Sequence, residues 1–119
     1  MIKETEVLNV LGEEIPHMNP ELEKLAGTGN VYKCIQCFAD FTKELLITGN
    51  LKAAKTCFRV AEKMMEEGNT AVRNAMENVF VFSVTVMVDV SSPFNAAIKS
   101  LMKGPVLKEY RRQTHMKGI

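Results

Sequence analysis

The sequence predicts an all-α fold built from antiparallel helical hairpins, and two observations lead to that prediction. A Gly-Asn step recurs at about one helix length, at Gly29-Asn30, Gly49-Asn50 and Gly68-Asn69. Between the steps, apolar residues return every three or four positions, as on one face of a helix. Gly is a common left-handed C-terminal cap and Asn a favoured N-cap, so each step ends one helix and begins the next. We expect five to seven helices, as an α-α superhelix or a compact bundle.

Residues 30–67 form the predicted central hairpin. The apolar stripe of its first helix comprises Val31, Cys34, Ile35, Phe38, Phe41, Leu45 and Leu46. The stripe of its second helix comprises Leu51, Ala54, Cys57, Phe58, Ala61, Met64 and Met65. Charged and polar residues occupy the opposite faces, which is the pattern of amphipathic helices. The connection between the two helices is so short that they must run antiparallel.

A long apolar helix is predicted over about residues 69–88. The stretch from 79 to 90 also shows the alternation of a strand, through Val84, Val86 and Val88. We favour a helix because no turn residue interrupts the stretch and a lone strand would lack a partner; the strand remains the alternative. A helix so apolar must be buried on nearly all sides. It is therefore the central core helix or part of a dimer seam, with Asp89 near its exposed end.

The C-terminal part is predicted to form basic helices within residues 92–113. Ser92 caps a helix whose first residue is Pro93, and Gly104 ends it. Pro105 then opens a last short helix through Tyr110, and the final residues, 114–119, fray.

The N-terminal part is predicted to hold two short helices. The first runs from Lys3 to Leu11, and the second begins at Asn19-Pro20 and ends at Gly27.

Length and composition point to one domain over residues 1–119. The chain is 46% hydrophobic and 24% charged, as in an ordinary globular protein. No apolar run reaches the roughly 18 to 20 residues of a membrane span, and the first residues do not read as a secretory signal. Three cysteines, an odd number, indicate reduced thiols rather than a disulfide framework. We expect a cytoplasmic protein with no membrane association.

The charges are distributed unevenly along the chain. Residues 1–29 hold two Lys and six Glu, a net charge of −4, whereas residues 96–119 hold six basic residues and one Glu, a net charge of +5. The segment between them is neutral. The two ends are therefore complementary: they lie together within one molecule, or they meet between molecules, or the basic tail binds an acidic partner.

The hairpin at residues 35–67 resembles a tetratricopeptide repeat. Phe38, Phe41 and Leu45 stand where the repeat places large residues, and the second helix carries its small-large-small signature at Ala54, Phe58 and Ala61. Thr42 and Glu66 depart from the pattern, at positions of a Gly and a Pro, which indicates a different opening angle. One unit is present, so flanking helices or a second chain must complete the array. The chain also resembles small bacterial all-helical proteins of unassigned activity.

Other constellations favour structural roles, and we predict no catalytic residue, metal or cofactor. Cys34 and Cys37 share a helix face but lie beyond its first turn, so buried, inert thiols are expected. His17 and His115 lack partners at the spacing of a catalytic triad. Acidic neighbours interrupt a basic stripe on the second hairpin helix, so we expect no nucleic-acid binding; the stripe comprises Lys52, Lys55, Arg59 and Lys63.

The leading hypothesis is a non-catalytic module that binds a protein or peptide partner. The resemblance places the concave binding face on Gln36, Ala39, Lys43 and Leu46 of one helix and Thr70, Arg73, Glu77 and Phe80 of the next. From these we select as partner-binding residues Gln36, Lys43, Leu46, Arg73, Glu77 and Phe80. The second hypothesis is a small homo-oligomer with a structural or regulatory role. The third is a metal or redox protein built on the three cysteines, Cys34, Cys37 and Cys57.

Overall fold

A computed structural model describes residues 1–25, 27, 30–89 and 95–116 of the chain. Its elements are η1 (Glu4–Glu6), α1 (Val7–Glu14), η2 (Pro16–Met18), α2 (Asn19–Glu23), α3 (Val31–Ile47), α4 (Leu51–Glu67), α5 (Thr70–Ala75), η3 (Met76–Val81), α6 (Phe82–Asp89), α7 (Asn95–Leu101) and α8 (Gly104–Met116). The elements α5, η3 and α6 follow one another without a break. Counted as one helix, they bring the described residues to seven helices beside two short 3₁₀ turns, and the predicted all-α fold is confirmed.

Three asparagines start the three longest helical runs, as predicted. The side-chain oxygens of Asn30, Asn50 and Asn69 each accept a hydrogen bond from the backbone N–H three residues further on, at 3.2, 3.3 and 3.0 Å. Each bond satisfies one of the N–H groups that a helix leaves unpaired at its start.

The glycines before these caps do not all behave as predicted. Gly49 is left-handed, with φ of 77°, and ends α3 as expected. Gly68 is extended instead, with φ of −70° and ψ of 150°, because the chain pairs there with Ile2. The N–H of Ile2 donates to the Glu67 carbonyl at 2.6 Å, and the N–H of Asn69 donates to the Ile2 carbonyl at 2.8 Å. Gly29 lies outside the described residues.

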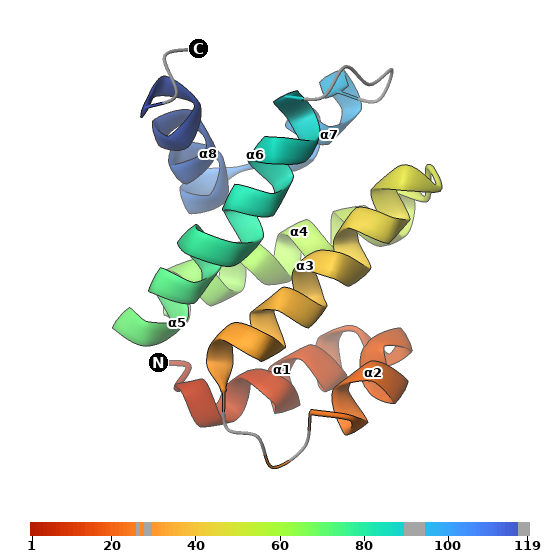
Figure 1. The fold of residues 1–119 in the computed structure, drawn as a ribbon, viewed down its shortest axis with the longest axis vertical. Helices are drawn as coiled ribbons and strands as arrows, with labels where there is room; N and C mark the ends of the chain where they lie inside the picture. The colour runs from red at the N-terminus through yellow and green to blue at the C-terminus, as the bar shows by residue number, and fades with distance from the viewer. Residues whose placement is uncertain (26, 28–29, 90–94, 117–119) are drawn as a thin grey trace.

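The helix predicted over residues 69–88 is confirmed, and the strand alternative is wrong. Its middle section, η3, is π-helical. The run crosses the molecule between α3 and α8, and α4 lies behind it (Figure 1). Phe80 in η3 stacks on Phe38 of α3, with ring centroids 4.7 Å apart, and meets Phe58 of α4 edge-on at 5.8 Å. This cluster of aromatic rings joins three helices at the centre of the core.

The same helix is apolar enough, by length and composition, to cross a membrane over Thr70–Val88. In the fold, 44% of its most apolar stretch is buried inside the protein. Core helices pass the same test of length and composition, so this observation is weak evidence for a membrane span.

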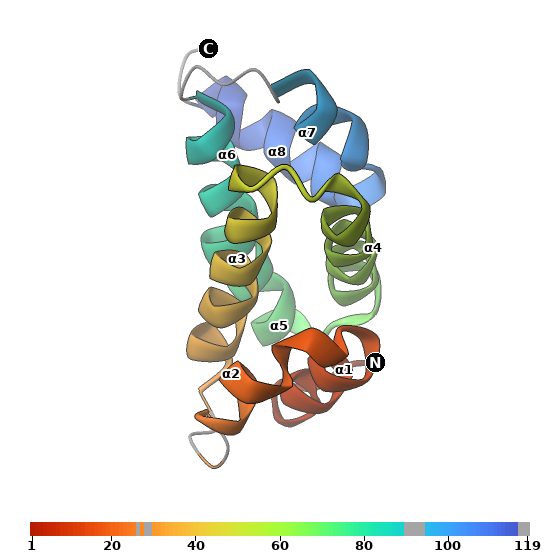
Figure 2. The same cartoon turned by 90° about the vertical axis from the view of Figure 1, so that its right-hand side faces the viewer.

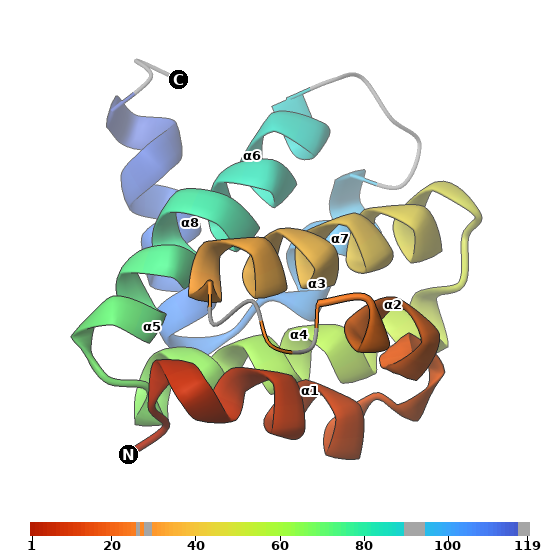
Figure 3. The same cartoon turned by 60° about the horizontal axis from the view of Figure 1, so that its bottom comes forward.

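The remaining helices close the two ends of the molecule. In Figures 1 and 2, α1 and α2 lie at the lower end of the longest axis, and α7 and α8 lie at the upper end. Figure 3 shows α4 returning alongside α3, which is the antiparallel hairpin that the sequence predicts. Thr42, at the position of the departure from the repeat pattern, is buried, and its hydroxyl donates to the Phe38 carbonyl at 2.9 Å.

The terminal helices differ in their bounds from the prediction. The first begins as the 3₁₀ turn η1 and continues to Glu14, and α2 ends at Glu23 instead of Gly27. Gly104, which was predicted to end the helix before it, is left-handed, with φ of 50°, and is the first residue of α8, whereas α7 ends at Leu101. The helix α8 continues through residues 114–116, predicted to fray, because its last turns are anchored on η3 by a side-chain hydrogen bond. Ser92 and Pro93 lie outside the described residues.

Candidate binding cleft

Part of the predicted partner surface lies in the core. Phe80 is fully buried and Leu46 is 1% exposed, so neither residue can touch a partner and the prediction is wrong for both. Ala39, on the same predicted face, is also buried. The physical reason is that η3 packs directly against α3 through the stacked rings of Phe38 and Phe80.

The other four predicted residues keep some exposure but do not form one site. Gln36 and Arg73 are exposed, whereas Lys43 and Glu77 are half-buried. Gln36 and Lys43 both reach Asp40 on their own helix, at 2.9 and 3.8 Å. Glu77 contributes its backbone carbonyl to a contact with α8. Among the described residues, no hydrogen bond or ion pair joins the two residues on α3 to Arg73 on α5 or Glu77 in η3.

The three cysteines lie in surroundings that suppress thiolate chemistry. Burial is the main cause that raises the pKa of the Cys34, Cys37 and Cys57 thiols above the ordinary value. Cys37, which is half-buried, also lies near the carboxylates of Glu21 and Asp40, which raise its pKa further. A protonated thiol is a poor nucleophile and a poor metal ligand. No group of three or more metal-binding side chains occurs in the part of the chain that the structure describes.

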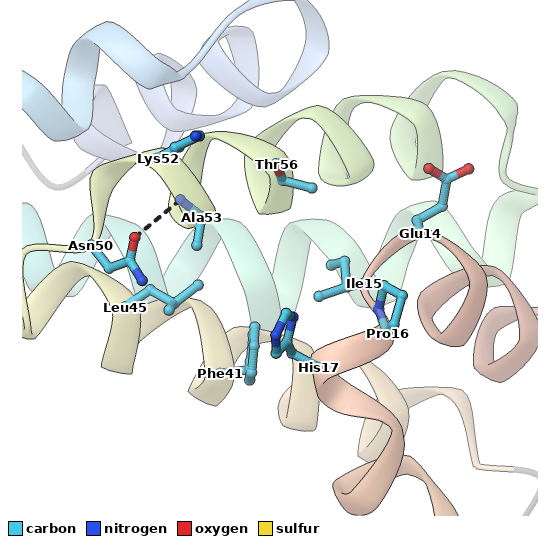
Figure 4. Close-up of a pocket in the computed structure, with 10 residues that line it drawn as sticks. All are labelled: Glu14, Ile15, Pro16, His17, Phe41, Leu45, Asn50, Lys52, Ala53 and Thr56. Atoms are coloured by element: carbon cyan, nitrogen blue, oxygen red, sulfur yellow. Dashed lines mark hydrogen bonds between the residues drawn. The ribbon is translucent and has the colours of Figure 1, made fainter.

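A cleft with a volume of about 700 Å³ lies between the turn after α1 and the closed end of the α3–α4 hairpin, where the two helices are joined (Figure 4). Three elements line it: the end of α1 with η2, the second half of α3 and the first half of α4. The lining residues are Glu14, Ile15, Pro16, His17, Phe41, Leu45, Asn50, Lys52, Ala53 and Thr56.

Local sequence explains why the cleft is open. Ile15 leaves the helical conformation, with φ of −133° and ψ of 75°, and Pro16 begins the turn η2, so the chain bends away from α4. On the other side, Phe41 and Leu45 stand one turn apart on α3 and are half-buried. Asn50 caps α4 through the backbone N–H of Ala53, and this bond fixes the position of Ala53 on the opposite wall of the cleft.

The cleft is apolar inside and charged only near its rim. Ile15, Leu45 and Ala53 give it an aliphatic floor, and Figure 4 shows the His17 ring beside the ring of Phe41. Glu14 points away from His17 in this view, and its carboxylate binds Lys63 of α4 at 3.1 Å. Hydrogen bonding to Glu14 is the main cause that raises the pKa of Lys63. The charge of Glu14 is therefore already balanced by α4.

Two smaller clefts are lined by more charged residues. One, of about 540 Å³ between α2 and α3, includes Cys37 with Lys24, Lys33 and Asp40 in its lining. The other, of about 430 Å³, lies where α4 meets the α7–α8 turn. Glu62 closes one side of that cleft: its carboxylate accepts the backbone N–H groups of Lys103 and Val106 at 2.8 and 3.1 Å. Both smaller clefts carry charges of each sign.

Fold and cleft together define a small all-α protein whose paired helices open onto an apolar, ligand-sized groove. A family model described as a domain of unknown function, DUF7674, matches residues 8–118. The chain therefore belongs to that family. No curated protein and no solved structure matches the chain.

Sequence reasoning missed the cleft because its walls come from segments that each read as ordinary. Phe41 and Leu45 belong to the predicted apolar stripe of the hairpin, and only the fold shows that they stay half-buried at its edge. His17, for which the sequence indicated no catalytic partner, lines the cleft and is exposed. The available signal was Pro16, which begins the turn η2 directly after the C-cap of α1.

Proposed function

We propose that the protein is a non-catalytic interaction module that binds an apolar segment of a partner peptide in the cleft between η2 and the α3–α4 hairpin. The observation that carries the proposal is the lining of the cleft: an aliphatic floor and an aromatic wall at the surface. Clefts of about 300–1,000 Å³ with an apolar lining and a few polar groups are the usual form of ligand sites. The volume here, about 700 Å³, fits one or two bulky side chains of a peptide.

The polar groups of the cleft suit orientation of a peptide. The hydroxyl of Thr56 and the side-chain amide of Asn50 lie on the α4 wall, where each offers a donor (Figure 4). Lys52 is exposed at the rim and favours a peptide with an acidic group beside its apolar residues. Glu14, already bound to Lys63, adds little repulsion.

The arrangement of ionisable groups supports binding rather than proton transfer. The ionisable residues of the cleft lining are Glu14, His17 and Lys52. In Figure 4 they lie on different sides of the cleft and point away from one another. An acid and a base that act on one substrate atom must both come within hydrogen-bond reach of it.

The test is selection of a random-peptide library on the wild-type protein, followed by affinity measurements on two matched variants. Ala53→Trp fills the cleft, whereas Ala96→Trp adds the same group on the exposed face of α7. We expect enriched peptides with bulky apolar residues to bind the Ala53→Trp variant at least about tenfold more weakly, a loss of about 1.4 kcal/mol. The Ala96→Trp variant should bind them unchanged. Peptides that bind both variants alike would remove the cleft as the site.

The three cysteines of the chain are all free thiols in the structure. Free thiols favour a reducing compartment, so we propose a cytoplasmic location for this activity.

A further inference from the structure

The two ends of the molecule carry opposite charges at its surface. The acidic end, residues 1–25, holds two Lys and six Glu. Five of these glutamates are exposed: Glu4, Glu6, Glu13, Glu21 and Glu23. The basic end, residues 95–116, holds five Lys or Arg residues, all exposed, and a single Glu, which is buried. Its cationic residues are Lys99, Lys103, Lys108, Arg111 and Arg112.

The fold holds these two ends apart. The longest dimension of the molecule is 38 Å, and Figures 1 and 2 place α1 and α2 at one end of that axis and α7 and α8 at the other. The distance between the ends exceeds the Debye length of about 8 Å at physiological ionic strength, so the two blocks are largely screened from one another within one molecule. Of the explanations for the complementary charges, their meeting within one molecule is therefore wrong.

We propose that a second copy of the chain docks antiparallel to the first, about a twofold axis perpendicular to the long axis. In this arrangement the acidic end of each copy faces the basic end of the other, so the complementary contact forms twice. In a closed twofold dimer, each of the four charged ends contacts an end of opposite charge. A head-to-tail contact instead leaves one acidic end and one basic end without a partner, so further molecules add and a filament grows.

The start of α6 supplies apolar area for the same contact. Phe82 and Val86 lie one turn apart and expose 49% and 41% of their surfaces. In Figure 1, the continuous run of α5, η3 and α6 crosses the middle of the long axis, where the twofold axis of an antiparallel pair must pass. A standard interface buries about 800 Å² on each partner, which is about an eighth of the 6714 Å² surface of this chain.

The test uses two charge-reversed variants of the full chain. One carries Glu13→Lys, Glu21→Lys and Glu23→Lys, which brings the acidic end from −4 to +2. The other carries Lys99→Glu, Lys108→Glu and Arg111→Glu, which brings the described basic end from +4 to −2. We expect the wild type to sediment as a dimer at low ionic strength and to dissociate as salt rises. Each variant alone should be a monomer, with unchanged helical circular dichroism.

Mixing the two variants is the decisive step, because each reversed end then meets an end of opposite charge. We expect the equimolar mixture to sediment as a dimer. Val86→Glu in the wild type should weaken the dimer without loss of helix content. A wild-type monomer at every concentration tested, a mass that keeps rising beyond the dimer, or a mixture that stays monomeric would overturn the proposal. The cleft variant Ala53→Trp should still dimerise. The dimer proposal and the peptide-binding proposal can therefore be overturned separately.

Discussion

The side-chain amide of Gln113 on α8 donates a hydrogen bond to the backbone carbonyl of Glu77 in η3, at 2.8 Å. The same amide nitrogen donates to the carboxylate of Glu109 at 2.9 Å. The i→i+5 hydrogen bonds of a π-helical turn depart from the regular ladder of an α-helix. Gln113 therefore attaches the last helix of the chain to the irregular turn of the central helix.

Gln113→Leu should lower the free energy of unfolding by about 1–2 kcal/mol, because the Glu77 carbonyl loses a partner in a part-buried site. Urea unfolding followed by circular dichroism measures the loss. Gln36→Leu is the control, since Gln36 bonds only to exposed Asp40 on its own helix, and we expect it to change stability by less than about 0.5 kcal/mol. Equal effects of the two substitutions would contradict an anchoring role for Gln113.

Phe80→Ala should lower the free energy of unfolding by about 3–5 kcal/mol, because it removes a fully buried ring that stacks on Phe38 and meets Phe58. Phe82→Ala removes the same atoms two residues away, from a side chain that is 49% exposed. Phe82→Ala should therefore lower the free energy of unfolding much less than Phe80→Ala does. Thermal unfolding of both variants compares the positions directly. If Phe82→Ala proved the more damaging, the orientation of this helix in the core would be wrong.

Enlarging Ala54 or Ala61 to Leu should destabilise the protein by about 1–3 kcal/mol, because both residues are completely buried on α4 and the isobutyl side chain of Leu must displace neighbours. Lys55→Leu places the same group on the exposed face of the same helix, and should leave stability within about 0.5 kcal/mol of the parent. Chemical denaturation midpoints provide the comparison. A uniform response at the three positions would rule out this packing of the hairpin.

Gly68→Ala should be destabilising although Gly68 is not left-handed. An added Cβ would lie 2.7 Å from a methyl carbon of Val72, which is buried and cannot move away freely. Gly12→Ala is the matched control: the added Cβ meets the end of the exposed Asn19 side chain, and Ala is favoured over Gly inside a helix by about 0.5–1 kcal/mol. We expect the melting temperature to fall for the first variant and to hold or rise for the second.

The stability should also depend on pH through Glu109. Hydrogen bonding from Arg112, at 2.8 Å from its Nε, is the main cause that holds the pKa of the Glu109 carboxyl below its ordinary value. Because the pKa is lower in the folded than in the unfolded protein, the carboxylate contributes stability that is present above the unfolded value. That contribution is lost as the pH falls through the folded value.

Glu109→Gln should therefore lower the free energy of unfolding at pH 7 and make it fall less steeply on acidification. Urea titrations at pH 7 and at pH 3 measure both effects. Glu13→Gln, at an exposed position on α1, should leave the parent's pH dependence in place. A Glu109→Gln variant whose loss of stability is the same at both pH values would show that its effect is steric.

The sequence predicted the helices well where local chemistry decides them. Asn30, Asn50 and Asn69 cap helices as expected because an N-cap depends on the residue and its near neighbours alone. Gly68 was predicted wrongly because its conformation depends on Ile2, a residue far away in the sequence. Local pattern carries no information about such a pairing.

The candidate site was less predictable for a related reason. Phe80 and Leu46 were placed on a partner surface by their position in a repeat register, yet burial depends on how closely η3 packs against α3. The cleft forms where η2 bends away from the hairpin, and its lining joins residues from three elements. The position of such a gap depends on the angles between helices, which periodicity does not specify.

The pairing of Ile2 with Gly68 has a consequence for how the chain reaches this structure. Its two hydrogen bonds join residue 2 to residues 67 and 69, so they close a loop of more than half the chain. Chains are synthesised from the N-terminus, and domains begin to fold as they emerge from the ribosome. The first residues must therefore wait, with Ile2 undocked, until α4 has been made and has left the ribosomal tunnel.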